Sequence, residues 1–256
     1  MCQSHRVFYA RPAFCPARSG KLYSFVPPQR PSSIAASKHR NDYTTPVRAL
    51  IFANGELPSR ALIDSLRRQA DLVVAADGGV DHALAAGIGV DAVVGDLDSA
   101  SEASRQALPA GHFHHLPDPN ATDLQKAIGY CVDKGCEAID VVAAGGGRAD
   151  HALANLSVLS MFRGRAAIRI VDDLFDVSLV DGSATFDAPA GTVVSLVAIG
   201  PCHGVTTSGL RWNLLHADLG FSPLGVHNEV ARPPASVSVE SGDLLLFKGR
   251  WVEKHG

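Results

Sequence analysis

Residues 72–99 read LVVAADGGVDHALAAGIGVDAVVGDLDS, and this stretch indicates the fold. It opens with an apolar run at 72–76, which we interpret as a buried strand. Residues 80–86 then have the spacing of a short helix, which Gly87 closes. A second apolar run follows at 92–94. A strand, a helix and a strand in this order are typical of a parallel β-sheet.

The same alternation extends in both directions along the chain. The pattern predicts further strands and helices, with Thr122 as the N-cap of one helix. The strands are expected at 49–53, 139–144 and 166–171, and the helices at 58–69, 122–134 and 150–162. We therefore expect an α/β fold in which a parallel sheet is flanked by helices, Rossmann-like in its arrangement.

The pattern changes after Asp181. Short apolar runs are separated there by Gly, Pro, Asp and Ser, and no helical spacing lies between them. These runs are 184–186, 193–197, 204–207, 237–239 and 244–247. We predict a small all-β sandwich domain at 182–256, following an α/β domain at 48–181.

The segment before Arg48 has a different composition from the rest. It contains seven basic residues and one acidic residue, set among Ser and Pro. We expect a disordered extension, or translation from a start codon upstream of the true one. An organelle transit peptide is the alternative, because such peptides are basic and poor in acids. Residues 1–47 are therefore left out of the predicted fold.

The overall composition excludes several functional classes. Of the 256 residues, 46% are hydrophobic and 19% are charged, which is typical of a soluble globular protein. The net charge of -3 offers no basic face for nucleic acid, and no apolar run is long enough to cross a membrane. The five cysteines form no C-x-x-C pair, so we expect reduced thiols and a cytoplasmic location.

Aspartates stand where the predicted strands end or the following helices begin. They are Asp77, Asp96, Asp98, Asp123 and Asp150. Because ligands bind outside the carboxyl ends of the strands in an open parallel sheet, several of these acids should converge on one edge. Carboxylates without His or Cys partners favour Mg²⁺. Each aspartate taken alone is more simply a helix cap or a turn former, but five at successive positions favour a metal site.

A glycine-rich loop follows the strand predicted at 139–144. It reads Gly145-Gly146-Gly147-Arg148. Glycines let backbone N–H groups approach phosphates closely, and the N-terminus of the following helix favours negative charge. The guanidinium of Arg148 suits phosphate oxygens. The loop matches neither a P-loop nor a dinucleotide fingerprint, and a triple glycine taken alone is as often a tight turn as a binding loop.

Five short motifs in fixed order resemble the signature of the thiamine pyrophosphokinase family. They are Asp77-Gly78-Gly79, Gly95-Asp96-Leu97-Asp98-Ser99, Thr122-Asp123-Leu124-Gln125-Lys126, Gly146-Gly147-Arg148-Ala149-Asp150-His151 with Asn155, and Thr207-Ser208-Gly209-Leu210-Arg211-Trp212. The resemblance runs from about Arg48 to Phe247. It implies transfer of pyrophosphate from ATP to the hydroxyl of thiamine, giving thiamine diphosphate and AMP. It also implies a homodimer with thiamine sites between the subunits.

The resemblance further implies a role for particular residues. Magnesium would be held by Asp96, Asp98 and Asp123, and the catalytic set would add Arg148. The nucleotide and its phosphates would contact Asp77, Gly78, Gly146, Gly147, Arg148 and Asp150. Thiamine would contact Trp212, His227 and Asn228. Stacking of the cationic thiamine on Trp212 would be a cation–π contact, although a tryptophan here could also be a core residue of the sandwich.

Two positions depart from the family pattern. His227 stands where the family has a serine, and Pro119 stands where it often has a glutamine. The first affects thiamine recognition, and the second affects one contact on the phosphate side. Two other functions remain open: a pterin diphosphokinase of related fold, and a non-catalytic sensor of thiamine or nucleotide. The G-L-x-W element argues against the first, and the intact acidic set argues against the second.

Overall fold

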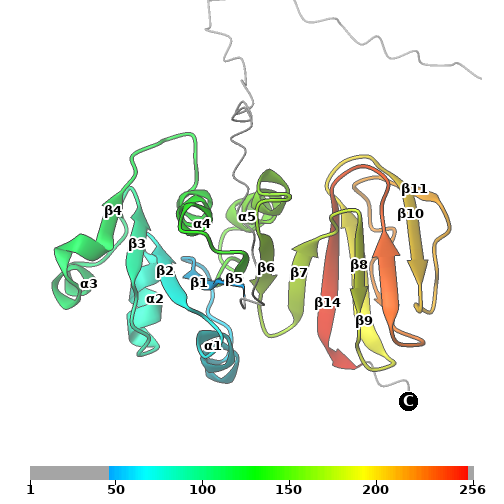
Figure 1. The fold of residues 1–256 in the computed structure, drawn as a ribbon, viewed down its shortest axis with the longest axis horizontal. Coiled ribbons are helices and arrows are strands. Elements are labelled where there is room, and N and C mark those ends of the chain that lie inside the picture. Colours follow the sequence, from blue (N-terminus) through cyan, green and yellow to red (C-terminus); the bar gives the residue numbers. More distant parts are fainter. Residues whose placement is uncertain (1–45, 253–256) are drawn as a thin grey trace, which may run out of the picture. The chain divides into compact units, whose positions relative to one another are not determined.

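The computed structural model describes residues 46–252, so the segment 1–45 lies outside the described residues. Within the described range, ten strands form one sheet in the order β12-β9-β14-β7-β6-β5-β1-β2-β3-β4. The half from β4 to β6 is parallel throughout (Figure 1). Its strands are β1 (Arg48–Phe52), β2 (Leu72–Ala76), β3 (Ala92–Gly95), β4 (Phe113–His115), β5 (Ala138–Val142) and β6 (Ala167–Val171).

Helices cover both faces of the parallel half. They are α1 (Arg60–Arg67), α2 (Gly79–Ala85), α3 (Glu102–Ala107), α4 (Asp123–Asp133) and α5 (Ala149–Met161), and a 3-10 turn spans Ala110–His112. One buried cluster contains α1 and α2, and another contains α4 and α5. Figure 1 shows these two pairs on opposite sides of the sheet.

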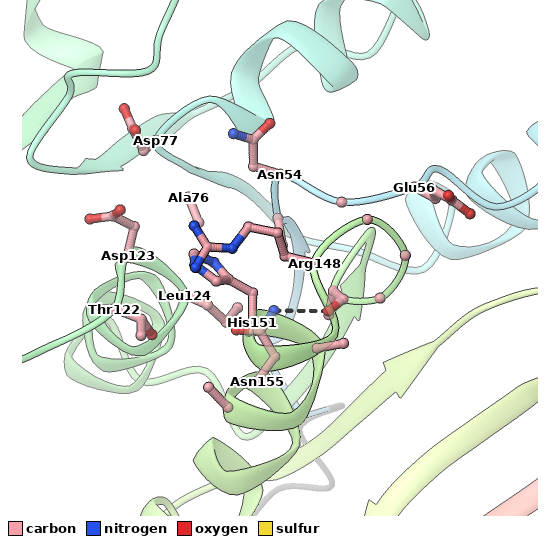
Figure 2. Close-up of a pocket in the computed structure, with 18 of the residues that line it drawn as sticks. Asn54, Glu56, Ala76, Asp77, Thr122, Asp123, Leu124, Arg148, His151 and Asn155 are labelled. Carbon is pink, nitrogen blue, oxygen red and sulfur yellow. Dashed lines mark hydrogen bonds between the residues drawn. The ribbon is translucent and has the colours of Figure 1, made fainter.

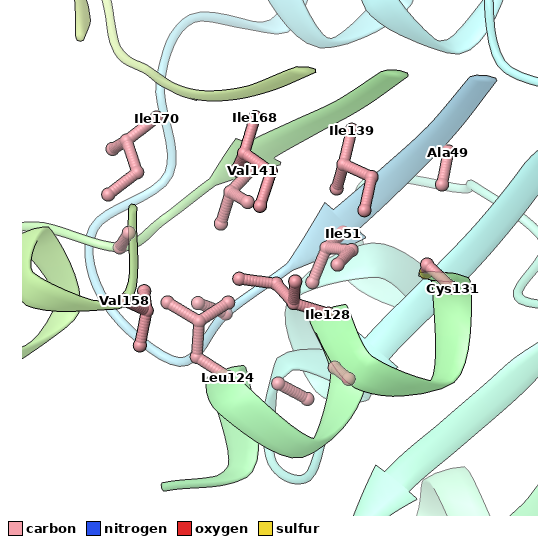
Figure 3. Packing of buried hydrophobic residues seen from close by; sticks show 14 of the residues in the cluster. Ala49, Ile51, Leu124, Ile128, Cys131, Ile139, Val141, Val158, Ile168 and Ile170 are labelled. Carbon is pink, nitrogen blue, oxygen red and sulfur yellow. The ribbon is translucent and has the colours of Figure 1, made fainter. Parts of the chain in front are cut away.

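Helix α4 shows why the sequence folds this way locally. The Thr122 hydroxyl accepts a hydrogen bond from the Gln125 N–H at 3.2 Å, so Thr122 caps the helix as its position predicts. Leu124, Ile128 and Cys131 recur at helical spacing on one face and are all buried. Figure 3 shows this face of α4 turned toward the strands that carry Ile51 and Ile139.

The same sheet continues beyond the parallel half as antiparallel strands. They are β7 (Phe175–Leu179), β14 (Leu244–Val252), β9 (Thr192–Ala198) and β12 (Asn228–Glu229). Strand β7 pairs with β6 on one side and with β14 on the other. The last described strand, β14, therefore lies between β7 and β9.

A second sheet of four strands packs on this continuation. Its order is β11-β10-β13-β8, with β8 (Ser183–Phe186), β10 (Cys202–Ser208), β11 (Ala217–Leu219) and β13 (Ala235–Ser238). A third buried cluster joins residues of β9 and β14 to residues of β10 and β13. The strands after residue 182 thus form two layers, and one of these layers is continuous with the α/β sheet.

The expected order of an α/β region followed by a β region is confirmed. The elements that were not predicted include helix α3 and strands β7, β11 and β12. Helix α3 is short and polar, and it is held by its Ser101 cap rather than by an apolar stripe. Strands β7 and β12 join the sheet through partners distant in sequence. Among the described residues, no helix is both long and apolar enough to cross a membrane.

Candidate active site

Three of the predicted aspartates come together at the carboxyl edge of the parallel sheet. Asp77 follows β2, Asp96 follows β3, and Asp123 begins α4. Each offers a carboxylate oxygen, and these oxygens lie within 4.8 Å of one another. A side chain on Gly95 would reach within 2.9 Å of an Asp123 oxygen, so glycine is required for the three to meet.

Asp77 is the buried member of this group. It is 4% exposed, and its backbone has a φ of 43°, a conformation that aspartate tolerates better than most residues. Its Oδ2 accepts a hydrogen bond from the Ser99 N–H at 3.1 Å, whereas its Oδ1 is buried and has no partner among the described residues. Burial raises the pKa of Asp77, and the nearby carboxylates raise it further.

Asp98 lies outside the group of three. Its side chain accepts a hydrogen bond from the Ser99 hydroxyl at 2.9 Å, and its backbone N–H donates to Asp96. Leu97 between them has a φ of 64°, which turns the chain sharply between the two aspartates. The assignment of Asp98 as a metal ligand therefore stays a prediction. In the structure, the carboxylate that lies close to those of Asp96 and Asp123 belongs to Asp77.

Lys126 is a site residue to which the sequence reasoning gave no role. Its ammonium lies 2.9 Å from an Asp123 oxygen, and its side chain is 6% exposed. The positive charge thus reduces the repulsion among the three carboxylates. The sequence did contain a signal for this contact. Asp123 and Lys126 are three residues apart on a predicted helix, and this spacing places an acid and a base on one face.

The glycine loop, residues 145–148, lines one cavity together with Asp77 and Asp123. Gly146 and Gly147 adopt φ values of +79° and +61°, which other residues seldom adopt. Arg148 donates two hydrogen bonds to the carboxylate of Asp150, at 3.1 and 2.6 Å. These bonds lower the pKa of Asp150 to about 2. Both side chains are exposed, so the pair can open without leaving a buried charge.

Asp77, Asp123 and the glycine loop line a cavity of about 730 Å³. Figure 2 shows Asp77 and Asp123 on one side of it and Glu56 on the other, with Arg148 between them. Asn155 also lines the cavity, and its amide donates to the Ala144 carbonyl at 2.8 Å. Residues that line it without a predicted role are Asn54, Glu56, Ser99, His82 and His151. Gly78 caps α2 beside Asn54, and a side chain there would meet the Asn54 amide.

The three residues expected to contact thiamine lie in the β region, and none of them lines this cavity. Trp212 is 54% exposed, with the guanidinium of Arg211 centred 4.9 Å from its ring. Asn228 accepts a hydrogen bond from the Trp212 N–H and donates one to the Trp212 carbonyl. The backbone N–H of His227 donates to the Ser195 hydroxyl at 2.9 Å. Asn228 therefore fixes the backbone that carries Trp212.

Family models match both regions of the chain. Residues 63–171 match the model described as thiamin pyrophosphokinase, catalytic domain. Residues 184–244 match the model described as thiamin pyrophosphokinase, vitamin B1 binding domain. The two matches together cover most of the residues that line the cavity and the turn that carries Trp212.

Individual relatives agree with the family models. The thiamine pyrophosphokinase of Bacillus subtilis is 27% identical over 190 residues, which is 69% of this chain and 86% of the relative. Thiamine pyrophosphokinase 3 of rice is 28% identical over 61% of this chain, and the match spans 64% of the rice protein. A crystal structure of the Bacillus subtilis protein superposes with a TM-score of 0.69 at 25% identity, covering 79% of this chain and 98% of that one.

Proposed function

The chain belongs to the thiamine pyrophosphokinase family, and we propose that it transfers the terminal diphosphate of ATP to the hydroxyl of thiamine, releasing AMP. The single observation that carries this proposal is the meeting of Asp77, Asp96 and Asp123 beside the glycine loop. A cation site next to a phosphate-binding loop is what phosphoryl transfer requires.

We propose that Mg²⁺ occupies this group. The fit rests on the Oδ1 atom of Asp77, which is buried without a partner and would be satisfied by a cation. The donor set is also suitable, because it consists of carboxylate oxygens without His or Cys. When bound, the ion would neutralise charge on the phosphate oxygens of ATP.

The residues of this chain would then hold the reacting groups in line. Arg148 and the backbone of the glycine loop bind the phosphates, with Arg148 leaving Asp150 for a phosphate oxygen. The thiamine hydroxyl attacks the β-phosphorus of ATP. The bond between this phosphorus and the oxygen that bridges it to the α-phosphorus breaks, and AMP leaves with that oxygen. The hydroxyl proton passes to a carboxylate at the sheet edge. Positioning and electrostatics provide most of the rate in reactions of this kind.

We propose that the acceptor stacks on Trp212 in a homodimer. Two observations support a site built from two chains. The cavity beside the aspartates is lined by residues no later than Asn155. The segment 212–226 exposes five large apolar side chains. They are Trp212, Leu215, Phe221, Leu224 and Val226. In this arrangement, residues 48–181 act as the Rossmann-like nucleotide domain and residues 182–256 as the thiamine domain.

We also propose a cytoplasmic location for the enzyme. The cysteines of the described part, Cys131, Cys136 and Cys202, are all free and buried. Free thiols are typical of a reducing compartment.

The pterin diphosphokinase and the sensor are the competing functions. The match of residues 184–244 to a vitamin B1 binding domain favours thiamine over a pterin. The test is AMP formation from ATP, measured with thiamine, with a hydroxymethyl pterin and with neither. AMP that appears only with thiamine supports the proposal, whereas AMP with the pterin alone supports the first competitor. No AMP under any condition supports the sensor.

A further inference from the structure

The turn between β3 and α3 holds all three clustered carboxylates through its backbone N–H groups. The Asp96 N–H donates a hydrogen bond to Oδ1 of Asp123 at 3.2 Å, and the Asp98 N–H donates one to Oδ1 of Asp96 at 3.3 Å. The Ser99 N–H donates to Oδ2 of Asp77 at 3.1 Å. The position of this turn therefore sets how the three carboxylates face one another.

Two carbonyl groups of the same turn are held by Arg105, a residue of α3. Its Nε donates to the Ala100 carbonyl at 3.3 Å, and its Nη2 donates to the Leu97 carbonyl. Leu97 has a φ of 64°, a left-handed conformation that costs free energy in leucine and persists only where the surrounding structure holds it. One guanidinium thus holds both the strained residue of the turn and its last residue.

Helix α3 is itself anchored to α2 by Asp81. The Asp81 carboxylate accepts hydrogen bonds from the Ser101 N–H at 3.2 Å, from the Ser101 hydroxyl at 2.7 Å and from the Ser104 hydroxyl. The Ser101 hydroxyl also caps α3 by accepting the Ser104 N–H at 3.2 Å. Arg105 therefore reaches the turn from a helix whose start is fixed in place.

Arg105 lies outside the site that it supports. The described residues that line the cavity of about 730 Å³ do not include it. Its guanidinium donates to backbone carbonyls of the turn, and the N–H groups of that turn donate to the carboxylates. Removing a group that orients metal ligands in this indirect way typically changes metal affinity or activity by roughly 10- to 100-fold.

We propose that Arg105 is a positioning residue for the cation site of Asp77, Asp96 and Asp123. The inference rests on the proposed function, because it takes these three carboxylates as the site of Mg²⁺. The charge of Arg105 would act in the opposite direction, since a positive charge near the site repels a cation. Loss of the arginine should therefore weaken cation binding if Arg105 acts through the turn, and strengthen it if Arg105 acts through its charge.

The first experiment measures cation binding without substrates. The dissociation constant for Mn²⁺ alone, followed by electron paramagnetic resonance of the free ion, should rise roughly tenfold in Arg105→Gln. Arg60→Gln makes the same chemical change at a matched control position. Arg60 pairs with Asp64 on its own helix, α1, and its side chain is 61% exposed. The control variant should bind Mn²⁺ like the unaltered protein.

Steady-state kinetics separate a positioning role from a general loss of structure. At saturating magnesium, the kcat of Arg105→Gln should lie within about twofold of the unaltered value, because the ligands themselves are intact. The free magnesium concentration that gives half of the maximal rate should rise roughly tenfold, and the KM for thiamine should not change.

Arg105→Lys guards against a folding defect in Arg105→Gln. The lysine ammonium keeps the charge but lacks the planar fork that reaches two carbonyls, so the constant for Mn²⁺ should rise only about threefold.

The outcomes separate this inference from the proposed function. If the unaltered protein makes no AMP, the proposed function fails. If it makes AMP and both Arg105 variants bind Mn²⁺ as tightly as the unaltered protein, or more tightly, the inference is overturned. A loss of affinity that Arg60→Gln shares would also overturn it. The same holds if the active, unaltered protein binds no Mn²⁺ on its own, because the carboxylates that the turn holds would then form no cation site.

Discussion

The ammonium of Lys126 lies 2.9 Å from a carboxylate oxygen of Asp123, one turn earlier on α4. It is the one lysine or arginine that the described residues place in direct contact with the group of Asp77, Asp96 and Asp123. The carboxylates can therefore approach one another before any cation binds.

Lys126→Met should destabilise the protein most when magnesium is absent. The substitution leaves a partly buried carboxylate without its partner, which costs about 1–3 kcal/mol in free energy of unfolding. Magnesium should restore part of this loss because it replaces the missing charge. Urea unfolding with and without magnesium measures both effects, and Lys126→Arg is the control that keeps the charge. A loss that magnesium does not reduce would contradict the account.

Asp77→Asn should have opposite effects on activity and on metal-free stability. The amide keeps the volume but removes a charge whose pKa is raised by burial, so the melting temperature without magnesium should rise. Turnover should fall by roughly 10²-fold or more, since electrostatic stabilisation of the phosphates is lost. Calorimetry and an AMP assay test the two parts. A variant with normal turnover at ordinary magnesium would remove Asp77 from the site.

Asp98→Asn separates the two possible ligand sets. Because Asp98 lies outside the group of three, its substitution should leave the metal-free melting temperature unchanged. If Asp98 joins the site when magnesium binds, as the family resemblance implies, turnover should still fall about as far as in Asp77→Asn. Normal turnover in Asp98→Asn would leave Asp77, Asp96 and Asp123 as the complete set.

Trp212→Ala should weaken thiamine and spare ATP. Arg211 covers part of the indole, and the ring remains 54% exposed, which leaves surface for a cationic ligand. A desolvated cation–π contact contributes about 2 kcal/mol, so the KM for thiamine should rise roughly thirtyfold. The KM for ATP in the same variant is the internal control. An unchanged KM for thiamine would favour the pterin acceptor.

Asp176→Asn should lower stability in a pH-dependent way. Burial alone would raise the pKa of Asp176, but a hydrogen bond from Arg250 at 2.6 Å and the nearby charge of Lys248 lower it. A lowered pKa means that the charged form stabilises the fold above the unfolded-state pKa, and that this stability is lost as the pH falls through the folded-state pKa.

The difference between Asp176→Asn and the unaltered protein should therefore be about 1–3 kcal/mol at pH 7 and shrink only below about pH 4. Urea unfolding across this range measures it. Asp181→Asn is the control, because Asp181 is exposed and lies 3.9 Å from its partner Arg163, so it should have little effect at any pH. A difference for Asp176→Asn that is constant with pH would rule out the charge network as its cause.

The parallel half of the fold was predictable because its signals are local. Each apolar run in 72–99 is bounded by Gly or Asp, so the end of each strand can be located. The residue that follows a strand end then lies at the carboxyl edge of the sheet. This is why the meeting of Asp77 with Asp96 and Asp123 could be expected from the chain alone.

What could not be predicted depends on contacts that are distant in sequence. The sequence of residues 244–247 does not reveal that this strand extends to Val252. It also does not reveal that the strand pairs with β7 in the sheet that contains the parallel strands. Leu156 of α5 and Phe247 of β14, far apart in the sequence, likewise line one cavity of about 350 Å³. The burial of the Lys126 ammonium follows from packing around α4, which spacing does not reveal.

The measurement that tests the central claim most directly is the release of AMP from ATP by the full chain with magnesium, in the presence and absence of thiamine. Thiamine diphosphate should form in equal amount to AMP, and Asp123→Asn should abolish both. AMP should not accumulate without thiamine. Release of ADP instead, or AMP formation that is independent of thiamine, would contradict a pyrophosphoryl transfer to this acceptor.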